Sequence, residues 1–334
     1  MLTRQNRNTI LIAVAIFVVT QTFIFASIPN NTDRDSVAIL VKSGTGLWEI
    51  ADKLKKNGLI RYPSLFVLCS LAYRGRLLAG EYELRKDMSI IEIVAKMGRG
   101  ERNIYVLKIL EGHNLYNIAE MAEKSGIMGS DEFLRLARDP GFLKRLGIKA
   151  DSLEGYLPPD TYYYSREIST DHFIERIVKK TFKNFAKEDI KRGMENLKFD
   201  THKTLILASI IEKEARLKEE KPVISAVFHN RLKQGMSLDA DPTVIYGTGN
   251  FNGPITRSDL STPTPYNTYK FPGLPKGPIC NPDRNSIMAA LYPASVDYLY
   301  FVSKNDGTHV FSKDMNDHNR YVAMYQRAKN AKKQ

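Results

Sequence analysis

An apolar segment near the N-terminus constrains this chain more than any other feature. Residues 9–28 read TILIAVAIFVVTQTFIFASI, and no charged side chain occurs between Arg7 and Asp33. At ~1.5 Å of rise per residue, a helix of this length crosses the ~30 Å hydrocarbon core of a bilayer. We therefore expect a short N-terminal tail at residues 1–8 and a transmembrane anchor at residues 9–28.

The residues around this segment predict whether it is cleaved off and how it is oriented in the membrane. Its end reads Phe25-Ala26-Ser27-Ile28, a poor match to the A-x-A pattern of a signal-peptide cleavage site. Arg4 and Arg7 precede it without an acidic residue, and positive residues stay on the cytoplasmic side. We therefore predict a single-pass protein of the cytoplasmic membrane that retains this segment, with its N-terminus inside and the rest of the chain outside the cytoplasm.

Composition and charge narrow the class of protein. The chain has 334 residues, 43% of them hydrophobic and 26% charged, which is typical of roughly two globular domains. Its net charge of +12 would suit nucleic acid, anionic lipid or an acidic polymer. The predicted location, and the absence of zinc-finger, RNP and Gly-rich phosphate motifs, argue against nucleic acid. The two cysteines, Cys69 and Cys280, lie far apart in sequence and are expected to be free thiols.

An internal repeat organises the first part of the chain. The pattern G-x-x-L-[WY]-x-I-A-[DE]-x5-G begins at Gly44 and again at Gly112. Each copy follows a β-rich run, which predicts a strand, a turn, a helix and a glycine stop. The first copy, SGTGLWEIADKL, resembles the LysM peptidoglycan-binding module. Trp48 and Tyr116 occupy equivalent positions, where aromatic residues can stack on sugars but are more often part of the core.

Local patterns predict several further elements. Residues 80–100 indicate a short strand, a Ser89 cap and an amphipathic helix, while residues 131–198 are mostly helical in pattern. The proline- and tyrosine-rich stretch 154–164 predicts a strand or a substrate-facing loop. A hairpin of residues 298–303 and 308–312, with an Asn-Asp-Gly turn, precedes a final basic helix at about residues 317–332.

The candidate catalytic groups are mainly carboxylates, because His309 and His318, the other candidate acid/base pair, suit ordinary capping or packing. The chain has no G-x-S-x-G or H-E-x-x-H motif, which argues against a serine hydrolase or a zinc peptidase. Residues 204–235 predict two helices broken at Pro222, and Glu212 falls on a stripe of small and apolar residues in the first. Such surroundings would keep a carboxylic acid protonated, as a general acid requires. Glu214 also has apolar neighbours, so periodicity separates the two glutamates poorly.

Two loops after these helices strengthen the case for a sugar site. Residues 239–249 and 261–282 are rich in Tyr, Thr, Asn, Pro and Gly, with little periodicity. Long ordered loops of this kind usually carry function, and hydroxyl, amide and aromatic groups suit the edges and faces of sugars. An inert loop packed by its prolines is the alternative.

The ordered motifs ASIIEKEA, FHNRLKQGM, DPTVIYG, TPYNTY, GLPKGPICNP and YLYFVSKNDGTHVFS resemble the YceG-like endolytic murein transglycosylase family. The resemblance covers about residues 37–325 and departs from the family pattern at Asp239 and Pro158. It implies an inner-membrane enzyme that cleaves nascent peptidoglycan strands internally, with cell-wall synthases (penicillin-binding proteins) as partners. It also implies that the first glutamate of E-K-E, Glu212, is the catalytic acid, and no metal or organic cofactor is implied.

The sequence thus predicts an α+β protein with one transmembrane helix, a small LysM-like domain and a larger mixed α/β catalytic domain. Expected boundaries are a linker at 29–36, the LysM-like domain at 37–101 and the YceG-like catalytic domain at 102–334, with a second LysM-like repeat at 105–128. Candidate sugar-binding residues are Asp241, Tyr246, Tyr266, Asn267 and Tyr269. The alternatives are a muramidase that pairs Glu212 with Asp241 or Asp239, and an inert glycan-binding scaffold for synthases.

Overall fold

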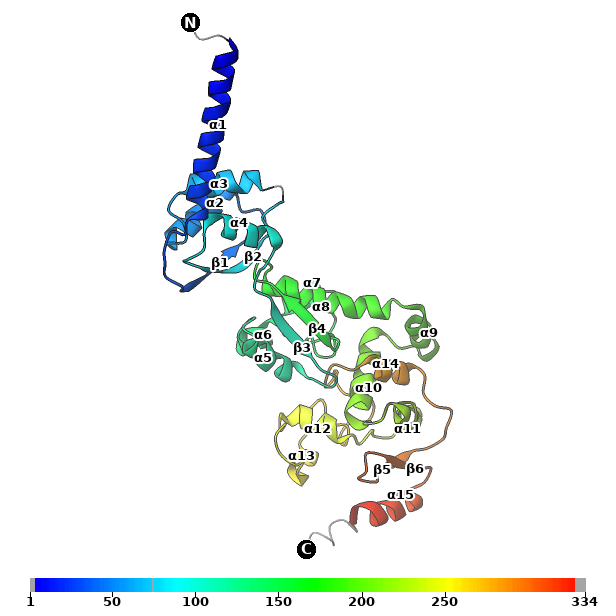
Figure 1. Cartoon of the computed structure of the whole chain (residues 1–334). Helices are drawn as coiled ribbons and strands as arrows, with labels where there is room; N and C mark the ends of the chain where they lie inside the picture. The colour runs from blue at the N-terminus through cyan, green and yellow to red at the C-terminus, as the bar shows by residue number, and fades with distance from the viewer. Residues whose placement is uncertain (1–3, 74, 328–334) are drawn as a thin grey trace. The chain divides into compact units, whose positions relative to one another are not determined.

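The structure is a computed structural model that describes residues 4–73 and 75–327. It is a mixed α/β protein of two compact units (Figure 1). Unit 1 holds the chain up to Tyr105 together with Tyr163–Thr170, and unit 2 holds Val106–Tyr162 and the chain from Asp171 onward. The mixed composition of helices and strands predicted from the sequence is confirmed.

Unit 1 is a two-stranded sheet covered by helices. Strand β1 (Ser36–Val41) pairs antiparallel with β2 (Gly80–Arg85), with Ile39 opposite Tyr82. Helices α2 (Leu47–Lys56), α3 (Pro63–Ala72) and α4 (Ile90–Arg99) contribute the rest of the core. The Ser89 cap of α4 is confirmed, because Ser89 and Glu92 form a reciprocal capping box. Helix α3 lies in a segment for which the sequence analysis made no assignment.

Helix α1 (Arg4–Ser27) is the first element of unit 1 and contains a candidate membrane span at Asn6–Ser27, judged by its length and apolar composition. Its last turn packs into the rest of the unit, because Ala26 is fully buried in the core of unit 1. The segment 29–36, expected as a linker, is held to the same unit. Asn30 donates to the Gly58 carbonyl at 3.0 Å, and Asp33 pairs with Lys86 at 2.9 Å.

The two copies of the repeat share one local geometry. In each copy a strand leads through a glycine of positive φ (Gly44, +85°; Gly112, +74°) into a helix, and a second such glycine follows the helix. These are backbone angles that other residues rarely adopt. The expectation that Trp48 and Tyr116 are core residues is wrong: they are 60% and 41% exposed. Their rings lie on the outer side of helices whose opposite faces are buried.

Unit 2 contains the second copy and the E-K-E segment. Apart from Tyr105 and Tyr163–Thr170, which belong to unit 1, its elements before that segment are β3 (Tyr105–Ile109), α5 (Leu115–Lys124), α6 (Ser130–Leu136), α7 (Pro140–Arg145), β4 (Asp160–Tyr164), α8 (Thr170–Phe185) and α9 (Glu188–Leu197). Strand β3 pairs with β4, so the 154–164 stretch includes a strand. The helical pattern predicted for 131–198 is confirmed on both sides of it.

The second half of unit 2 begins with two helices, α10 (Thr201–Glu214) and α11 (Lys221–Lys233), joined by a 3-10 turn, η1 (Lys218–Glu220). Three short helices follow: α12 (Asp241–Thr248), α13 (Arg257–Ser261) and α14 (Arg284–Leu291). The predicted hairpin is confirmed as β5 (Tyr300–Ser303) and β6 (His309–Ser312), with Phe301 opposite Phe311. The final helix forms as α15 (Met315–Val322) and a π-helical turn η2 (Ala323–Arg327), while residues 328–332 lie outside the described residues.

Candidate active site

Helix α10 places both glutamates of E-K-E in its last turn. The Asp200 side chain caps the start of the helix by accepting the Lys203 N–H at 2.7 Å, and the helix ends at Glu214. The backbone becomes extended at Ala215, so the break falls before the predicted position. Pro222 lies instead in the first turn of α11, where its missing N–H costs no helical hydrogen bond.

Glu212 does not have the small, apolar surroundings that the helical stripe predicted. Its Oε2 accepts three hydrogen bonds: from Ser286 Oγ at 2.6 Å, the Asp283 N–H at 2.9 Å and Lys221 Nζ at 3.1 Å. The side chain is only 8% exposed. The prediction was wrong because these donors come from α11 and the start of α14, which helical periodicity within α10 cannot reveal.

Lys221 joins Glu212 to a second buried carboxylate. Its Nζ lies 2.9 Å from Asp283 Oδ1, and both side chains are almost fully buried. Burial opposes the charge of Asp283, but hydrogen bonds from the Ser286 N–H, Lys221 and Asn285 outweigh it and lower the pKa of Asp283. Burial likewise lowers the pKa of Lys221, but its two carboxylate partners outweigh burial and hold that pKa above its ordinary value. This triad is a closed ion-pair network that ties α10, α11 and α14 together.

Glu214 faces a different environment. It lines a cavity of about 480 Å³ whose other walls come from the 231–241 segment, Tyr269, the β5–β6 hairpin and α15. Burial, and then the neighbouring Asp241 carboxylate, raise the pKa of Glu214 to about 8. The position of Glu214 at the C-terminus of α10 acts in the same direction, because the helix dipole disfavours an anion there. Glu214 thus has the protonated state and the open space that the sequence analysis assigned to Glu212.

Asp241 and Tyr269 line the same cavity and are bonded to one another. Tyr269 donates its hydroxyl to Asp241 Oδ1 at 2.6 Å, and Tyr269 is 37% exposed. Asp239 lies in the same wall with a positive φ of 49°, and its carboxylate pairs with the buried Arg231 at 3.0 Å. Both aspartates named in the two-carboxylate alternative therefore accompany Glu214 in this cavity, whereas the polar contacts of Glu212 lie in the ion-pair network.

Tyr246 and Tyr266 contact each other over a buried acid that the sequence analysis did not single out. Their ring centroids are 4.8 Å apart, and Tyr246 donates its hydroxyl to Glu154 Oε2 at 2.8 Å. Glu154 is 1% exposed and also accepts from the Leu115 N–H and from Asn281. Burial raises the pKa of Glu154 to about 7. The only sequence signal was an acidic residue within the aromatic and proline-rich stretch 154–164.

Tyr116 and Phe251 extend this tyrosine pair to the surface. Their ring centroids are 5.3 Å apart, and the Phe251 ring also lies 6.2 Å from that of Tyr246. Tyr116 comes from the second repeat and Phe251 from the loop after α12, and they are 41% and 39% exposed. Because Asp241 and Tyr246 are five residues apart on α12, they are separated by about 7.5 Å along the helix axis.

Asn267 is 1% exposed and uses its side chain within its own loop. Its amide donates to the Leu260 and Thr262 carbonyls at 3.0 and 2.8 Å, and its carbonyl accepts the Tyr269 N–H at 2.9 Å. These bonds hold the loop that presents Tyr266 and Tyr269. This placement favours a structural role for Asn267 over direct contact with sugar.

Replacing Asn267 by alanine is therefore expected to lower the free energy of unfolding by about 1–3 kcal/mol, because buried backbone groups lose their partners. Asn252 lies in the same loop system and is exposed, so Asn252→Ala serves as the matched control and should change stability by less than about 0.5 kcal/mol. Thermal unfolding of both variants tests this. Unchanged stability of Asn267→Ala together with weaker glycan binding would return this residue to the sugar site.

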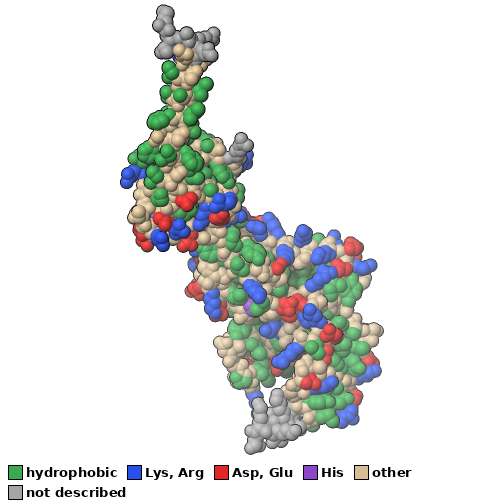
Figure 2. Space-filling view, viewed as in Figure 1, with side chains coloured by type: hydrophobic (Ala, Val, Ile, Leu, Met, Phe, Trp, Pro, Cys, Tyr) green, Lys and Arg blue, Asp and Glu red, His purple; other side chains and the backbone are tan. Residues whose placement is uncertain are grey.

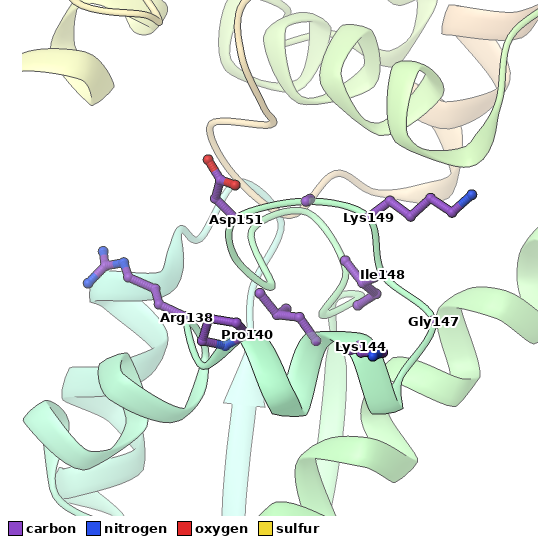
Figure 3. Close-up of a pocket in the computed structure, with 9 residues that line it drawn as sticks. Arg138, Pro140, Lys144, Gly147, Ile148, Lys149 and Asp151 are labelled. Atoms are coloured by element: carbon purple, nitrogen blue, oxygen red, sulfur yellow. The ribbon is translucent and has the colours of Figure 1, made fainter.

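A second cavity, of about 470 Å³, lies beside α7. Figure 3 shows the Arg138 and Lys149 side chains pointing away from each other rather than converging on a common point. Asp151, which also lines it, is paired with Lys276. The carboxylate that lines this cavity is thus held by a lysine, so the Glu214 cavity is the better candidate for the chemistry. Among the described residues, no group of three or more His, Cys, Asp or Glu side chains is arranged to hold a metal ion.

Comparisons with known proteins identify related sequences. The chain is 35% identical over 318 residues to an endolytic murein transglycosylase of Bacillus subtilis strain 168, covering 90% of this chain and 87% of that protein. It is 27% identical over 327 residues to an endolytic murein transglycosylase of Streptococcus pneumoniae strain D39. That alignment covers 88% of this chain and 59% of the longer streptococcal protein.

The fold has a counterpart among solved structures. A crystal structure of a YceG-like protein from Listeria monocytogenes aligns with a TM-score of 0.60 and 34% sequence identity, covering 86% of this chain and 99% of that one. The model of the YceG-like family matches residues 39–324, which include both copies of the repeat, α10 and the cavity at Glu214. The chain therefore belongs to the YceG-like family.

Proposed function

We propose that this protein is an endolytic murein transglycosylase that cleaves the bond between N-acetylmuramic acid and N-acetylglucosamine in peptidoglycan strands. The observation that carries the proposal is Glu214, a carboxyl group of raised pKa at the edge of a 480 Å³ cavity that also holds Asp241 and Tyr269. The names of the relatives from Bacillus subtilis and Streptococcus pneumoniae support the same reaction class.

Glu214 is the proton donor in this proposal, in place of Glu212. Protonated Glu214 gives its proton to the glycosidic oxygen as the bond to the anomeric carbon breaks. The resulting carboxylate then accepts the proton of the muramic acid C6 hydroxyl while that oxygen bonds to the anomeric carbon. The product carries a 1,6-anhydro ring, and no water is consumed. One carboxyl group thus acts first as acid and then as base.

In this proposal Asp241 stabilises the positive charge that develops at the anomeric carbon. Tyr269 fixes one of its carboxylate oxygens and leaves the other for substrate. An aromatic cluster lies around Tyr246, near the C-terminal end of α12, and can stack on other sugars of the same glycan strand. Its other members are Tyr116, Phe251 and Tyr266. Asn267 supports these groups through its loop rather than by contact.

Product analysis tests the reaction class. Purified peptidoglycan is digested with the full-length protein in detergent, and the new chain ends are examined by mass spectrometry in H₂¹⁸O. Anhydro-muramic ends without ¹⁸O are expected. Reducing ends that contain ¹⁸O would support a muramidase in which Glu214 and Asp241 act as two carboxylates. No product at all would support the inert scaffold.

The rate of glycan cleavage is expected to fall as the pH rises through about 8, because Glu214 must be protonated to start the reaction.

The raised pKa of Glu214 also affects the stability of the fold. The folded state binds more protons than the unfolded state between pH 4.5 and about 8, so stability falls as the pH rises over this window. Glu214→Gln removes this contribution. The difference in stability between this variant and the natural chain should therefore be small near pH 4 and grow, in favour of the variant, up to about pH 8. Denaturation at several pH values measures it.

The domain layout at 37–101 and 102–334 belongs to the proposal as well, with LysM-like modules at 37–101 and 105–128. The shared geometry of the two copies supports it, and the exposed Trp48 and Tyr116 rings are available to a glycan. Helix α1 anchors the chain in the cytoplasmic membrane with its N-terminus inside. An anchored enzyme in this orientation would meet nascent strands beside the membrane-bound synthases that make them.

A further inference from the structure

Helix α3 has an apolar face that the core of unit 1 does not use. One side of α3 is buried through Phe66, Val67 and Ser70. On the other side Leu68 and Leu71 are 53% and 70% exposed, and Tyr62 at the N-cap is 54% exposed. A helix on the surface of a soluble domain usually presents polar residues to water. We call Tyr62, Leu68 and Leu71 the α3 apolar surface.

This surface lies next to the candidate membrane span. Helix α1 contacts α3 and α4, and in Figure 1 α3 lies across the foot of α1. Hydrophobic side chains cover α1 and continue onto the adjoining part of unit 1 (Figure 2). Phe25 in the last turn of α1 and Ile28 just after it are 60% and 57% exposed. Both line one pocket with Tyr62, so the α3 apolar surface meets the segment that would enter the bilayer at Tyr62.

The junction leaves no free linker between span and unit. The 22-residue candidate span of α1 is about 33 Å long, close to the ~30 Å hydrocarbon core. Its Ala26 is fully buried in the core of unit 1, so the unit begins where the hydrocarbon ends. The neighbouring surface must then lie at the level of the lipid headgroups.

We propose that α3 is an interfacial helix that inserts Leu68 and Leu71 into the outer leaflet of the membrane that α1 crosses. The occupant of the α3 apolar surface is thus the lipid bilayer, and the proposal depends on α1 spanning it. Exposed leucines contribute by burial among acyl chains, and Tyr62 suits the boundary between headgroups and hydrocarbon. Arg61 and Arg76, both exposed, flank α3 and can pair with lipid phosphates. This contact would fix the orientation of unit 1 on the membrane.

Tryptophan quenching in proteoliposomes tests the proposal, because Trp48 is the single tryptophan of the chain. Full-length Trp48→Phe protein receives one reporter at a time, as Leu71→Trp, Phe17→Trp or Glu83→Trp. Phe17 lies within the span and is 62% exposed. Glu83 is an exposed residue of β2, a strand that Figure 1 draws on the side of unit 1 away from α1. Each variant is reconstituted in phosphatidylcholine and phosphatidylglycerol with or without brominated acyl chains.

Brominated lipid should quench the emission of the Leu71→Trp protein strongly, as it quenches the Phe17→Trp protein, and should leave the Glu83→Trp protein nearly unchanged. Quenching at position 71 as weak as at position 83, with strong quenching at position 17, would overturn the interfacial helix and leave the anchor intact. Weak quenching at position 17 would overturn both. Equally strong quenching at positions 71 and 83 would also overturn the interfacial helix, because the whole of unit 1 would then contact lipid. None of these outcomes depends on catalytic activity.

Discussion

Glu214→Gln is expected to reduce glycan cleavage by at least ~10²-fold, and up to ~10⁴-fold, while the protein stays folded. Glutamine preserves the shape of the side chain but can neither give the first proton nor accept the second. The folded state should hold or gain stability at neutral pH, because an acid of raised pKa is replaced by a neutral amide. Release of soluble muropeptides from purified peptidoglycan measures the loss.

Glu212→Gln is the matched control, two residues away on the same helix. It should retain most activity per folded molecule, because Glu212 takes part in the ion-pair network and does not line the Glu214 cavity. It should lose stability instead, since an acceptor of three hydrogen bonds is changed. If the Glu212→Gln protein were stable but inactive and the Glu214→Gln protein were active, Glu212 would be the catalytic acid.

Lys221→Met should have the largest effect on stability. Lys221 is 4% exposed, and its ammonium group bonds to Glu212 and Asp283. Its loss leaves two buried carboxylates without their cation, a change that costs about 3–5 kcal/mol in other proteins. This is a large part of the ~5–15 kcal/mol that stabilises a typical domain. Chemical denaturation, compared with the natural chain, gives the difference.

Two further variants make this prediction specific. Lys213 is exposed on the same helix as Glu212, so Lys213→Met should change stability by less than about 0.5 kcal/mol. Adding Glu212→Gln to Lys221→Met removes one of the two stranded carboxylates and should recover part of the loss, which would appear as non-additivity. Equal losses for Lys213→Met and Lys221→Met would contradict the network.

Features encoded by neighbouring residues were predictable from the sequence. The Ser89 capping box, the β5–β6 hairpin and the strand–turn–helix repeat each follow from residues a few positions apart. The choice between Glu212 and Glu214 was different. Residues 204–211 of α10 are buried, so its pattern has no clear polar side against which either glutamate could be judged. The three hydrogen-bond partners of Glu212 lie 9, 71 and 74 residues farther along the chain.

Tertiary contacts also decided the roles of the aromatic and amide residues. Asn267 lies in a polar loop and looked available to substrate, but its amide closes that loop on itself. Trp48 and Tyr116 looked like core residues by position in the helix, yet the opposite faces of α2 and α5 are the buried ones. The role of Glu154 could not be predicted from the sequence, because its hydrogen-bond partners come from three distant segments: Tyr246, Asn281 and the Leu115 N–H.

The acidic lining of the Glu214 cavity has a consequence for inhibition. Glu214, Asp239 and Asp241 all lie in its walls, and Arg231 balances only the charge of Asp239. As the pH rises through about 8, Glu214 loses its proton and the cavity gains negative charge. A sugar analogue with a basic nitrogen at the anomeric position would then bind more tightly, provided that the nitrogen stays protonated. Substrate turnover would decline over the same range, so affinity for the cationic inhibitor and catalytic rate would change in opposite directions.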